Sequence, residues 1–247
     1  MTRWLVTCSY DGTNFAGWQK QTNKRSVEAE INKAISAFDK GPFAVVGCSR
    51  TDAKVHALGQ CFHYDTKLNF AEIGLVKAIN TYLPADIYII GARVVPVDFH
   101  ARFSAKAKTY KYLINNGPYD VVLRNYQYHV PKELDLEAMQ QAATVFIGTH
   151  DFSAFCVTST KEKENQIRTI RAIKITKRGN IITLFFRGNS FLRYMVRMMV
   201  QTLVEVGRGR LSKEEVAAML ASKDKDACRY NAPPCGLYLV EVTYALD

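Results

Sequence analysis

Long apolar runs are absent from the 247-residue sequence, in which no segment approaches the roughly 18 consecutive apolar residues that a membrane-spanning helix requires. The first residues, Met1–Trp4, lead directly into a strand-like segment instead of the apolar core of a signal peptide. Hydrophobic residues make up 48% of the chain and charged residues 23%, as in ordinary globular proteins. We therefore expect a soluble, cytoplasmic protein with no membrane contact.

Patterns typical of metal sites, disulfide frameworks and nucleotide-binding loops are also missing. The cysteines are Cys8, Cys48, Cys61, Cys156, Cys228 and Cys235. They form no Cys-x-x-Cys pair and no Cys/His cluster at zinc spacing, so we expect neither a metal site nor a disulfide framework. A generic nucleotide-binding enzyme is disfavoured because neither Gly-x-x-x-x-Gly-Lys-Ser/Thr nor Gly-x-Gly-x-x-Gly occurs.

Acidic residues are scarce relative to basic ones. There are 23 Asp and Glu against 33 Lys and Arg, which gives a formal charge of +10. Such an excess favours a polyanionic partner such as nucleic acid, although it does not distinguish RNA from DNA. The alternative is that the charge serves solubility alone.

Hydrophobic periodicity predicts alternating groups of strands and helices. Strands are expected at 5–10, 60–64, 87–95, 106–112, 170–175, 181–187 and 237–242, and helices at 26–38, 73–83, 136–146, 190–206 and 212–220. Ser26 and Ser190 are candidate helix N-caps. Ser212 with Glu215 forms a capping box, and Gly179-Asn180 is a hairpin signal.

The second half of this pattern, from about residue 106, repeats the style of the first without repeating its sequence. The prediction is an α+β fold of two α/β subdomains, residues 1–105 and 106–247, with mixed, mainly antiparallel sheets.

The loop Gly47–Ala57 concentrates the candidate chemistry. Its ionisable residues are Arg50, Asp52, Lys54 and His56. A simple hairpin would need only turn formers such as Asn-Gly, so this composition points to a functional loop with Asp52 as its first candidate. The alternative is an Asx-type turn in which Asp52 caps its own backbone.

The strand at 106–112 carries a second set of candidates. Alternation places Lys106, Lys108, Tyr110 and Tyr112 on one face. Tyrosines beside cations could stack on a base and hold its phosphate. Alternatively, the tyrosines are half-buried core residues and the lysine side chains extend past them into solvent.

Two arginines on the helix expected at 190–206 complete the candidates. Arg193 and Arg197 are four residues apart and would lie on one side of it. A guanidinium on a mostly buried helix is costly to desolvate unless it meets an anion such as a carboxylate. The alternative is that both are solvated.

Several segments together carry a family pattern. They are Tyr10–Gln19, Arg50–Ala53, Phe99–Ala105, Phe191–Leu192 with Met195–Arg197, and Ala232–Pro234 with Gly236–Leu237. In this order they resemble the TruA family of tRNA pseudouridine synthases, over nearly the whole chain. The resemblance implies the pseudouridine synthase fold, in which the two subdomains meet at a central basic cleft.

The resemblance also implies an activity. It is the isomerisation of uridine to pseudouridine at positions 38, 39 and 40 of the tRNA anticodon stem-loop, without cofactor or metal. The family is typically a homodimer with tRNA lying across both subunits. The main alternative is a catalytically silent tRNA-binding or RNA-folding protein of the same fold.

Site residues follow from the matched positions. Asp52 matches the catalytic aspartate, Tyr110 the tyrosine that stacks on the target base, and Arg197 the arginine that pairs with the aspartate. Further substrate-binding residues are expected to be Arg50, which matches a residue thought to displace the target nucleotide, Leu237 at the back of the pocket, and Lys54 and His56 of the loop.

Two positions depart from the family pattern. The family usually has glycine where this chain has Ser49 and Lys54. Glycine suits left-handed or closely approached backbone, so a lysine at position 54 bears directly on the geometry of the loop. We hypothesise that Lys54 adds a phosphate contact.

Overall fold

The structure, a computed structural model, describes residues 1–41, 43–157 and 165–245. Contacts between Cα atoms divide the chain into two compact units. Unit 1 comprises Met1–Lys106 and Tyr238–Asp247, and unit 2 comprises Ala107–Leu237. The last strand of the chain groups with unit 1, where Tyr238 and Leu239 pair with His56 and Ala57.

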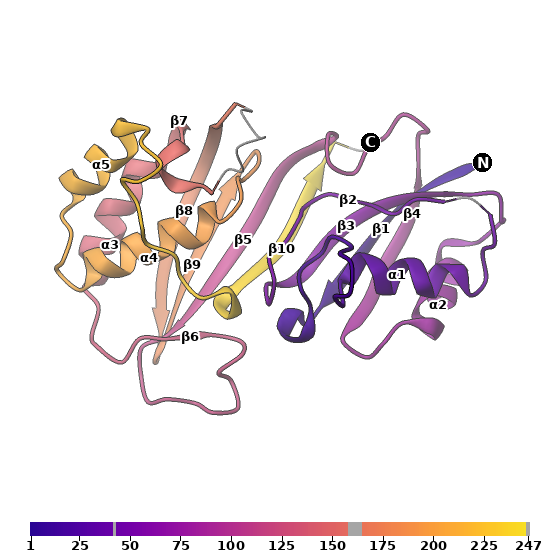
Figure 1. Ribbon diagram of the computed structural model, residues 1–247, viewed down its shortest axis with the longest axis horizontal. Helices are drawn as coiled ribbons and strands as arrows, with labels where there is room; N and C mark the ends of the chain where they lie inside the picture. The colour runs from indigo at the N-terminus through magenta and orange to yellow at the C-terminus, as the bar shows by residue number, and fades with distance from the viewer. Residues whose placement is uncertain (42, 158–164, 246–247) are drawn as a thin grey trace. The chain divides into compact units, whose positions relative to one another are not determined.

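Unit 1 contains a mixed sheet with two helices beside it (Figure 1). Its strands are β1 (Thr2–Tyr10), β2 (Val46–Gly47), β3 (His56–Thr66), β4 (Ile87–Val95) and β10 (Leu237–Tyr244), in the order β4-β1-β3-β10 with β2 on β3. β1 is antiparallel to both of its neighbours, whereas β10 is parallel to β3. The helices α1 (Val27–Ser36) and α2 (Glu72–Tyr82) pack against each other, and α2 packs on β4.

The start of α1 depends on backbone contacts. Ser26 is at the predicted N-cap position, but its side chain makes no capping hydrogen bond. The first N–H groups of the helix are instead bonded by the segment before it: Val27 N donates to Gly17 O at 3.2 Å and Glu28 N to Trp18 O at 3.0 Å. These carbonyls take the place of a side-chain cap.

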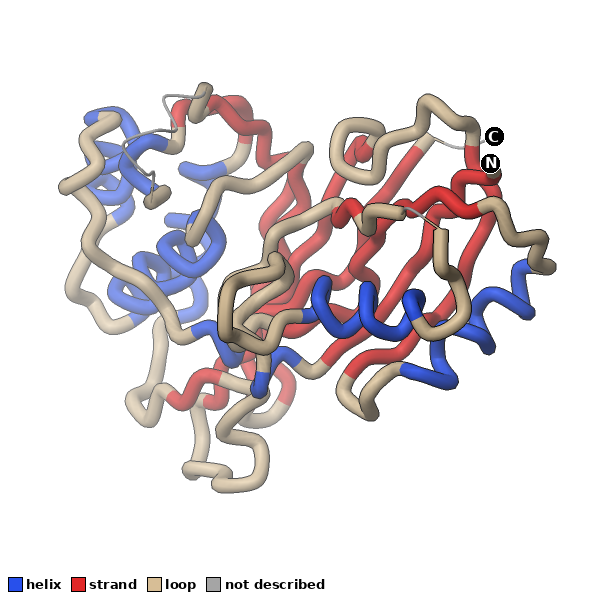
Figure 2. The backbone as a smooth tube through the Cα atoms, turned by 45° about the vertical axis from the view of Figure 1, so that its right-hand side comes forward, coloured by secondary structure: helices blue, strands red, loops and turns tan. Residues whose placement is uncertain are grey.

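Unit 2 combines largely antiparallel strands with helices (Figure 2). Its strands are β5 (Ala105–Asn115), β6 (Tyr128–His129), β7 (Gly148–Asp151), β8 (Ile167–Arg178) and β9 (Ile181–Gly188), in the order β5-β9-β8-β7 with β6 parallel to β5. The helices are α3 (Leu136–Ala143), α4 (Met195–Gly207) and α5 (Lys213–Ser222). The β8–β9 hairpin across Gly179-Asn180 and the Ser212–Glu215 capping box are confirmed.

Helix α4 begins later than predicted. It starts at Met195 after Tyr194, whose φ of 63° is left-handed, so Ser190 does not cap it. Arg193 therefore precedes the helix, and the expectation that Arg193 and Arg197 share one of its sides is wrong. A single left-handed residue interrupts a segment whose hydrophobic spacing is otherwise helical.

Both units combine helices with strands of mixed pairing, and the predicted α+β class is confirmed. Within the described part of the chain, no helix is long and apolar enough to cross a membrane.

His63 of β3 should make unit 1 sensitive to acid. Burial, with Arg3 and His100 nearby, lowers the pKa of His63 from 6.5 to about 4. Protons then bind the unfolded chain more readily than the folded one, so stability is unaffected above pH 6.5 and falls as pH drops from 6.5 toward 4. We expect urea unfolding to report a loss of about 1 kcal/mol between pH 7.5 and 5, allowing for partial screening by solvent. His63→Asn, which cannot titrate, should reduce this loss, and an equal loss in the variant would contradict the assignment.

Candidate active site

The loop that carries Asp52 connects β2 to β3 and is closed at its base by a buried amide. Cys48 N donates to Cys61 O at 2.7 Å. One step further, the Gln60 side chain pairs with the backbone of Ser49: its Nε2 donates to Ser49 O at 2.7 Å, and its Oε1 accepts from Ser49 N at 3.3 Å. The Gln60 side chain thus bonds the backbone of Ser49 where the loop leaves the sheet.

The other side of the loop is held by residues 10–18. Trp18 N donates to Thr51 O at 3.1 Å, and Lys54 N donates to Phe15 O at 3.1 Å. The Tyr10 and Thr51 hydroxyls are 2.7 Å apart. Asp52 therefore lies between two residues whose backbones are bonded to another segment, which restricts its position.

Gly17 permits this close approach. Its φ is +102°, and a Cβ there would lie 2.6 Å from Thr51 O and 3.1 Å from the Asp52 carbonyl carbon. Both the left-handed backbone and the lack of space require glycine.

The charged residues of the loop differ in exposure. Arg50 and Lys54 are exposed, whereas Asp52 is half-buried. Asp52 O accepts from Val55 N at 3.2 Å, which closes a turn over Ala53 and Lys54. Lys54 has a φ of 64°, which is a left-handed backbone conformation. Glycine adopts this conformation at a lower cost in free energy than lysine.

His56 is the first residue of β3, where the loop ends. It is 2% exposed, and its ring stacks on Tyr238 at 4.7 Å between centroids. Gly12 N donates to its Nδ1 at 3.0 Å. Asp11 Oδ1 is also 3.2 Å from that nitrogen, but an Nδ1 that accepts from Gly12 carries no proton for the carboxylate. We therefore interpret His56 as neutral at Nδ1 and as a support for the loop.

Tyr110 lies on β5 in unit 2. It is 8% exposed, and its ring meets Phe191 edge-on at 5.0 Å between centroids. Lys108 and Tyr112 of the same strand are also buried. Phe191 belongs to the segment before α4, so this contact joins β5 to one of the segments that carry the family pattern.

Arg197 lies in the first turn of α4 and is bonded to the proline-rich segment before β10. Its Nε donates to Ala232 O at 2.7 Å, and Ala232 N donates to Arg197 O at 3.1 Å. Its Cζ is 4.8 Å from the centroid of the Tyr194 ring, and the Arg193 Cζ is 5.0 Å from the same centroid. The left-handed Tyr194 thus places an aromatic ring near both guanidinium groups.

Leu237, 5% exposed, follows the 3₁₀ helix Pro234–Gly236. The Tyr112 hydroxyl donates to Pro233 O at 2.6 Å. Burial raises the pKa of Tyr112 well above its ordinary value, so the hydroxyl remains a donor at neutral pH. A Cβ on Gly236 would lie 2.6 Å from the Tyr112 ring, so this segment fits closely on β5.

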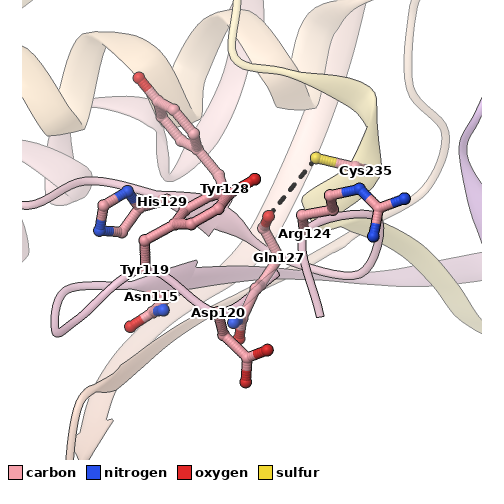
Figure 3. Close-up of a pocket in the computed structure, with 8 residues that line it drawn as sticks. All are labelled: Asn115, Tyr119, Asp120, Arg124, Gln127, Tyr128, His129 and Cys235. Carbon is pink, nitrogen blue, oxygen red and sulfur yellow. Dashed lines mark hydrogen bonds between the residues drawn. The ribbon is translucent and has the colours of Figure 1, made fainter. Parts of the chain in front are cut away.

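A separate cavity of unit 2, of about 230 Å³, lies beside β6 (Figure 3). Its lining residues are Asn115, Tyr119, Asp120, Arg124, Gln127, Tyr128, His129 and Cys235. The Asn115 amide is bonded to Gly117 N and Pro118 O, and Asp120 Oδ1 accepts from Val122 N and Leu123 N. These polar groups stabilise the loop itself, and none of the predicted site residues lines the cavity.

The structure therefore gathers the predicted residues into two groups. Arg50, Asp52, Lys54 and His56 lie in or directly after one loop of unit 1, and Tyr110, Arg197 and Leu237 lie in unit 2. Sequence reasoning missed Gln60, whose alternation in a strand gave no sign of its bonds to Ser49, and Tyr194, whose left-handed backbone had no local signal. In residues 1–41, 43–157 and 165–245, no group of three or more His, Cys, Asp or Glu could hold a metal ion.

The chain is similar to known proteins over nearly its full length. A family model described as tRNA pseudouridine synthase matches residues 7–104 and 142–245. tRNA pseudouridine synthase A of Halalkalibacterium halodurans is 45% identical over 239 residues, covering 96% of this chain and 90% of the relative. The synthase A of Anoxybacillus flavithermus is 44% identical over 245 residues, covering 99% of this chain and 99% of the relative. That of Limosilactobacillus reuteri is 42% identical over 253 residues, covering 100% of this chain and 98% of the relative. The matched ranges include the Asp52 loop, Arg197 and Leu237, while Tyr110 lies between them.

Proposed function

Because the chain belongs to the tRNA pseudouridine synthase family, we propose that it isomerises uridine to pseudouridine at positions 38, 39 and 40 of the tRNA anticodon stem-loop. The observation that carries the proposal is the Asp52 loop, which is bonded on one side to residues 10–18 and on the other to β3. A carboxylate held in this way suits chemistry that requires a fixed reacting group.

The reaction breaks the bond between C1′ and N1 and rejoins the same base through C5. An ionised Asp52 would add to the sugar or the base, or remove a proton from the sugar. Each route requires the carboxylate to keep its charge in surroundings that exclude water, which a guanidinium favours. We assign that role to Arg197.

The base must leave the RNA stack before the carboxylate can reach it. We assign Tyr110 to stack on the displaced base, which recovers roughly 1–3 kcal/mol of the lost stacking energy. Arg50 would help to displace the nucleotide, and Leu237 would form the back of the base pocket. His56, buried and bonded to Gly12, would act by supporting the loop.

The proposal includes the state and place in which the enzyme acts. We propose a cytoplasmic homodimer that binds tRNA across both subunits and uses neither metal nor cofactor. The formal charge of +10 supports binding to the tRNA backbone.

A tritium-release assay tests the activity. In tRNA labelled at C5 of uridine, the new glycosidic bond forms at that carbon and releases the label. We expect release from tRNA, with pseudouridine mapped chemically to positions 38–40. Tight tRNA binding without any release would instead support the alternative, a catalytically silent RNA-binding protein.

Lys54, exposed at the tip of the loop, should contribute one phosphate contact. We expect Lys54→Ala to reduce the slope of log K for tRNA binding against log salt concentration by about 1. Alanine is suited to this test because it removes the charge and keeps a Cβ at the left-handed position. Lys223→Ala is the matched control, since Lys223 is also exposed and left-handed with a φ of 56°. An unchanged slope in Lys54→Ala contradicts the contact.

A further inference from the structure

The segment Phe99–Ser104 between β4 and β5, here called the Phe103 loop, has no role in the proposed reaction, yet unit 1 holds it at several points. Arg3 Nη1 donates to Phe99 O at 2.8 Å, and the Tyr244 hydroxyl donates to Ala101 O at 2.8 Å. Ser104 N donates to His100 O at 2.8 Å. The backbone of the loop is therefore fixed to both ends of the unit 1 sequence.

Two histidines fix the centre of the loop by accepting backbone hydrogen bonds. His63 Nδ1 accepts from Ala101 N at 3.1 Å. His100 Nδ1 accepts from Arg102 N at 3.1 Å and from Phe103 N at 3.3 Å. Both rings are therefore unprotonated at Nδ1, and burial lowers the pKa of each. The neutral rings meet edge-on at 4.9 Å and support the loop tip.

This rigid tip presents an aromatic ring to solvent. Phe103 is 75% exposed, although burying such a side chain would contribute about 1.5–3 kcal/mol. Its ring lies against His100, with 4.3 Å between centroids and 32° between planes. The Arg102 Cζ is 5.6 Å from the Phe103 centroid, and Arg102 is also exposed.

The surroundings of the Phe103 ring favour a nucleic acid over a protein as its partner. A single exposed apolar residue is common and needs no explanation. Here the ring is instead held on a fixed backbone, backed by a second ring and flanked by a cation, which are the features of a site that stacks a nucleobase and contacts its phosphate. A protein partner would be expected to bury a wider apolar surface around the ring.

We propose that Phe103 stacks on an unpaired base of the substrate RNA, outside the reaction itself, and that Arg102 contacts an adjacent phosphate. This inference rests on the proposed function only in taking tRNA as the ligand. The site recognises any accessible base face, so it contributes affinity more than sequence preference.

Equilibrium binding of unmodified tRNA tests the stacking contact. We expect Phe103→Ala and Phe103→Leu each to weaken tRNA binding roughly 5- to 100-fold, because both variants lose the aromatic face that stacks on the base. Leucine retains the bulk of the side chain, so its effect reports the loss of the aromatic face alone. Phe103→Trp should bind as tightly as the wild type. The slope against salt concentration should be unchanged in all three variants, whereas Arg102→Ala should reduce it by about 1.

Val97→Ala is the matched control, because Val97 is 73% exposed on the same connection between β4 and β5 and should leave binding unchanged. Wild-type affinity in Phe103→Leu overturns the proposal. The proposal is also overturned if a Phe103 variant changes its oligomeric state, measured by sedimentation without RNA, while its tRNA affinity is unchanged. That result would assign Phe103 to a protein contact. Binding is measured without turnover, so a protein that binds through Phe103 but makes no pseudouridine supports this inference and refutes the proposed function.

Discussion

Asp52→Asn is expected to reduce the rate of pseudouridine formation by about 100- to 10,000-fold. Asparagine can neither take up a proton as a carboxylate does nor form the corresponding covalent bond. The amide is nearly the same size as the carboxylate, and backbone groups of Thr51, Lys54 and Val55 help to hold the loop in either variant. Folding and tRNA affinity should therefore stay close to those of the wild type. Single-turnover tritium release at saturating enzyme would measure the chemical step alone.

Asp226→Asn is a suitable control for this change. Asp226 is an exposed carboxylate of unit 2 between α5 and the proline-rich segment, so the same change in charge should leave turnover unaffected. Full activity of Asp52→Asn would refute the catalytic assignment. A loss of activity accompanied by an equal loss of tRNA binding would mean that Asp52 holds the RNA or the loop and does not take part in the chemistry.

Gly17→Ala is expected to destabilise the protein by roughly 2–5 kcal/mol and to abolish most activity, although Gly17 carries no reactive group. About 1–2 kcal/mol comes from an alanine at φ +102°, and a further 1–3 kcal/mol from the contacts that its Cβ would make. Those contacts are with Thr51 O and the Asp52 carbonyl carbon, so the loop must move to admit the methyl group. Urea unfolding and tritium release would be measured on the same preparation.

Gly179→Ala separates the two causes. Gly179 also has positive φ, +56°, but a Cβ there would meet nothing within 4 Å. We expect this variant to lose only about 1 kcal/mol and to retain activity. If Gly17→Ala were no less stable or active than Gly179→Ala, the close approach of residues 10–18 to the Asp52 loop would not matter for function.

Local signals in the sequence were reliable where neighbouring residues satisfy one another. The Ser212–Glu215 capping box and the Gly179-Asn180 hairpin involve groups within a few residues, so their geometry follows from the chain itself. At Ser26 the same reasoning located the N-cap but not its bonding, because Glu28 N, which a Ser26 side chain could cap, is bonded to Trp18 O. It failed at Ser190 because a left-handed Tyr194 delays the start of α4.

The histidines show what local sequence does not reveal. The sequence predicts His56 as a substrate-binding residue of the Asp52 loop, and the structure adds that its Nδ1 accepts from Gly12 N, 44 residues away. His63 accepts from Ala101 in the same way, 38 residues away. Which protons an imidazole carries depends on these distant backbone groups.

By itself, the sequence determined the α+β class, the charge that favours a polyanion, and the order of motifs that reveals the family, because each depends on residue type and spacing along the chain. Only the tertiary structure decided how the Asp52 loop is held, why Gly17 cannot be larger, and that Phe103 remains exposed on a fixed backbone. These features depend on hydrogen bonds and contacts between residues far apart in the sequence, and such residues come together only when the chain folds.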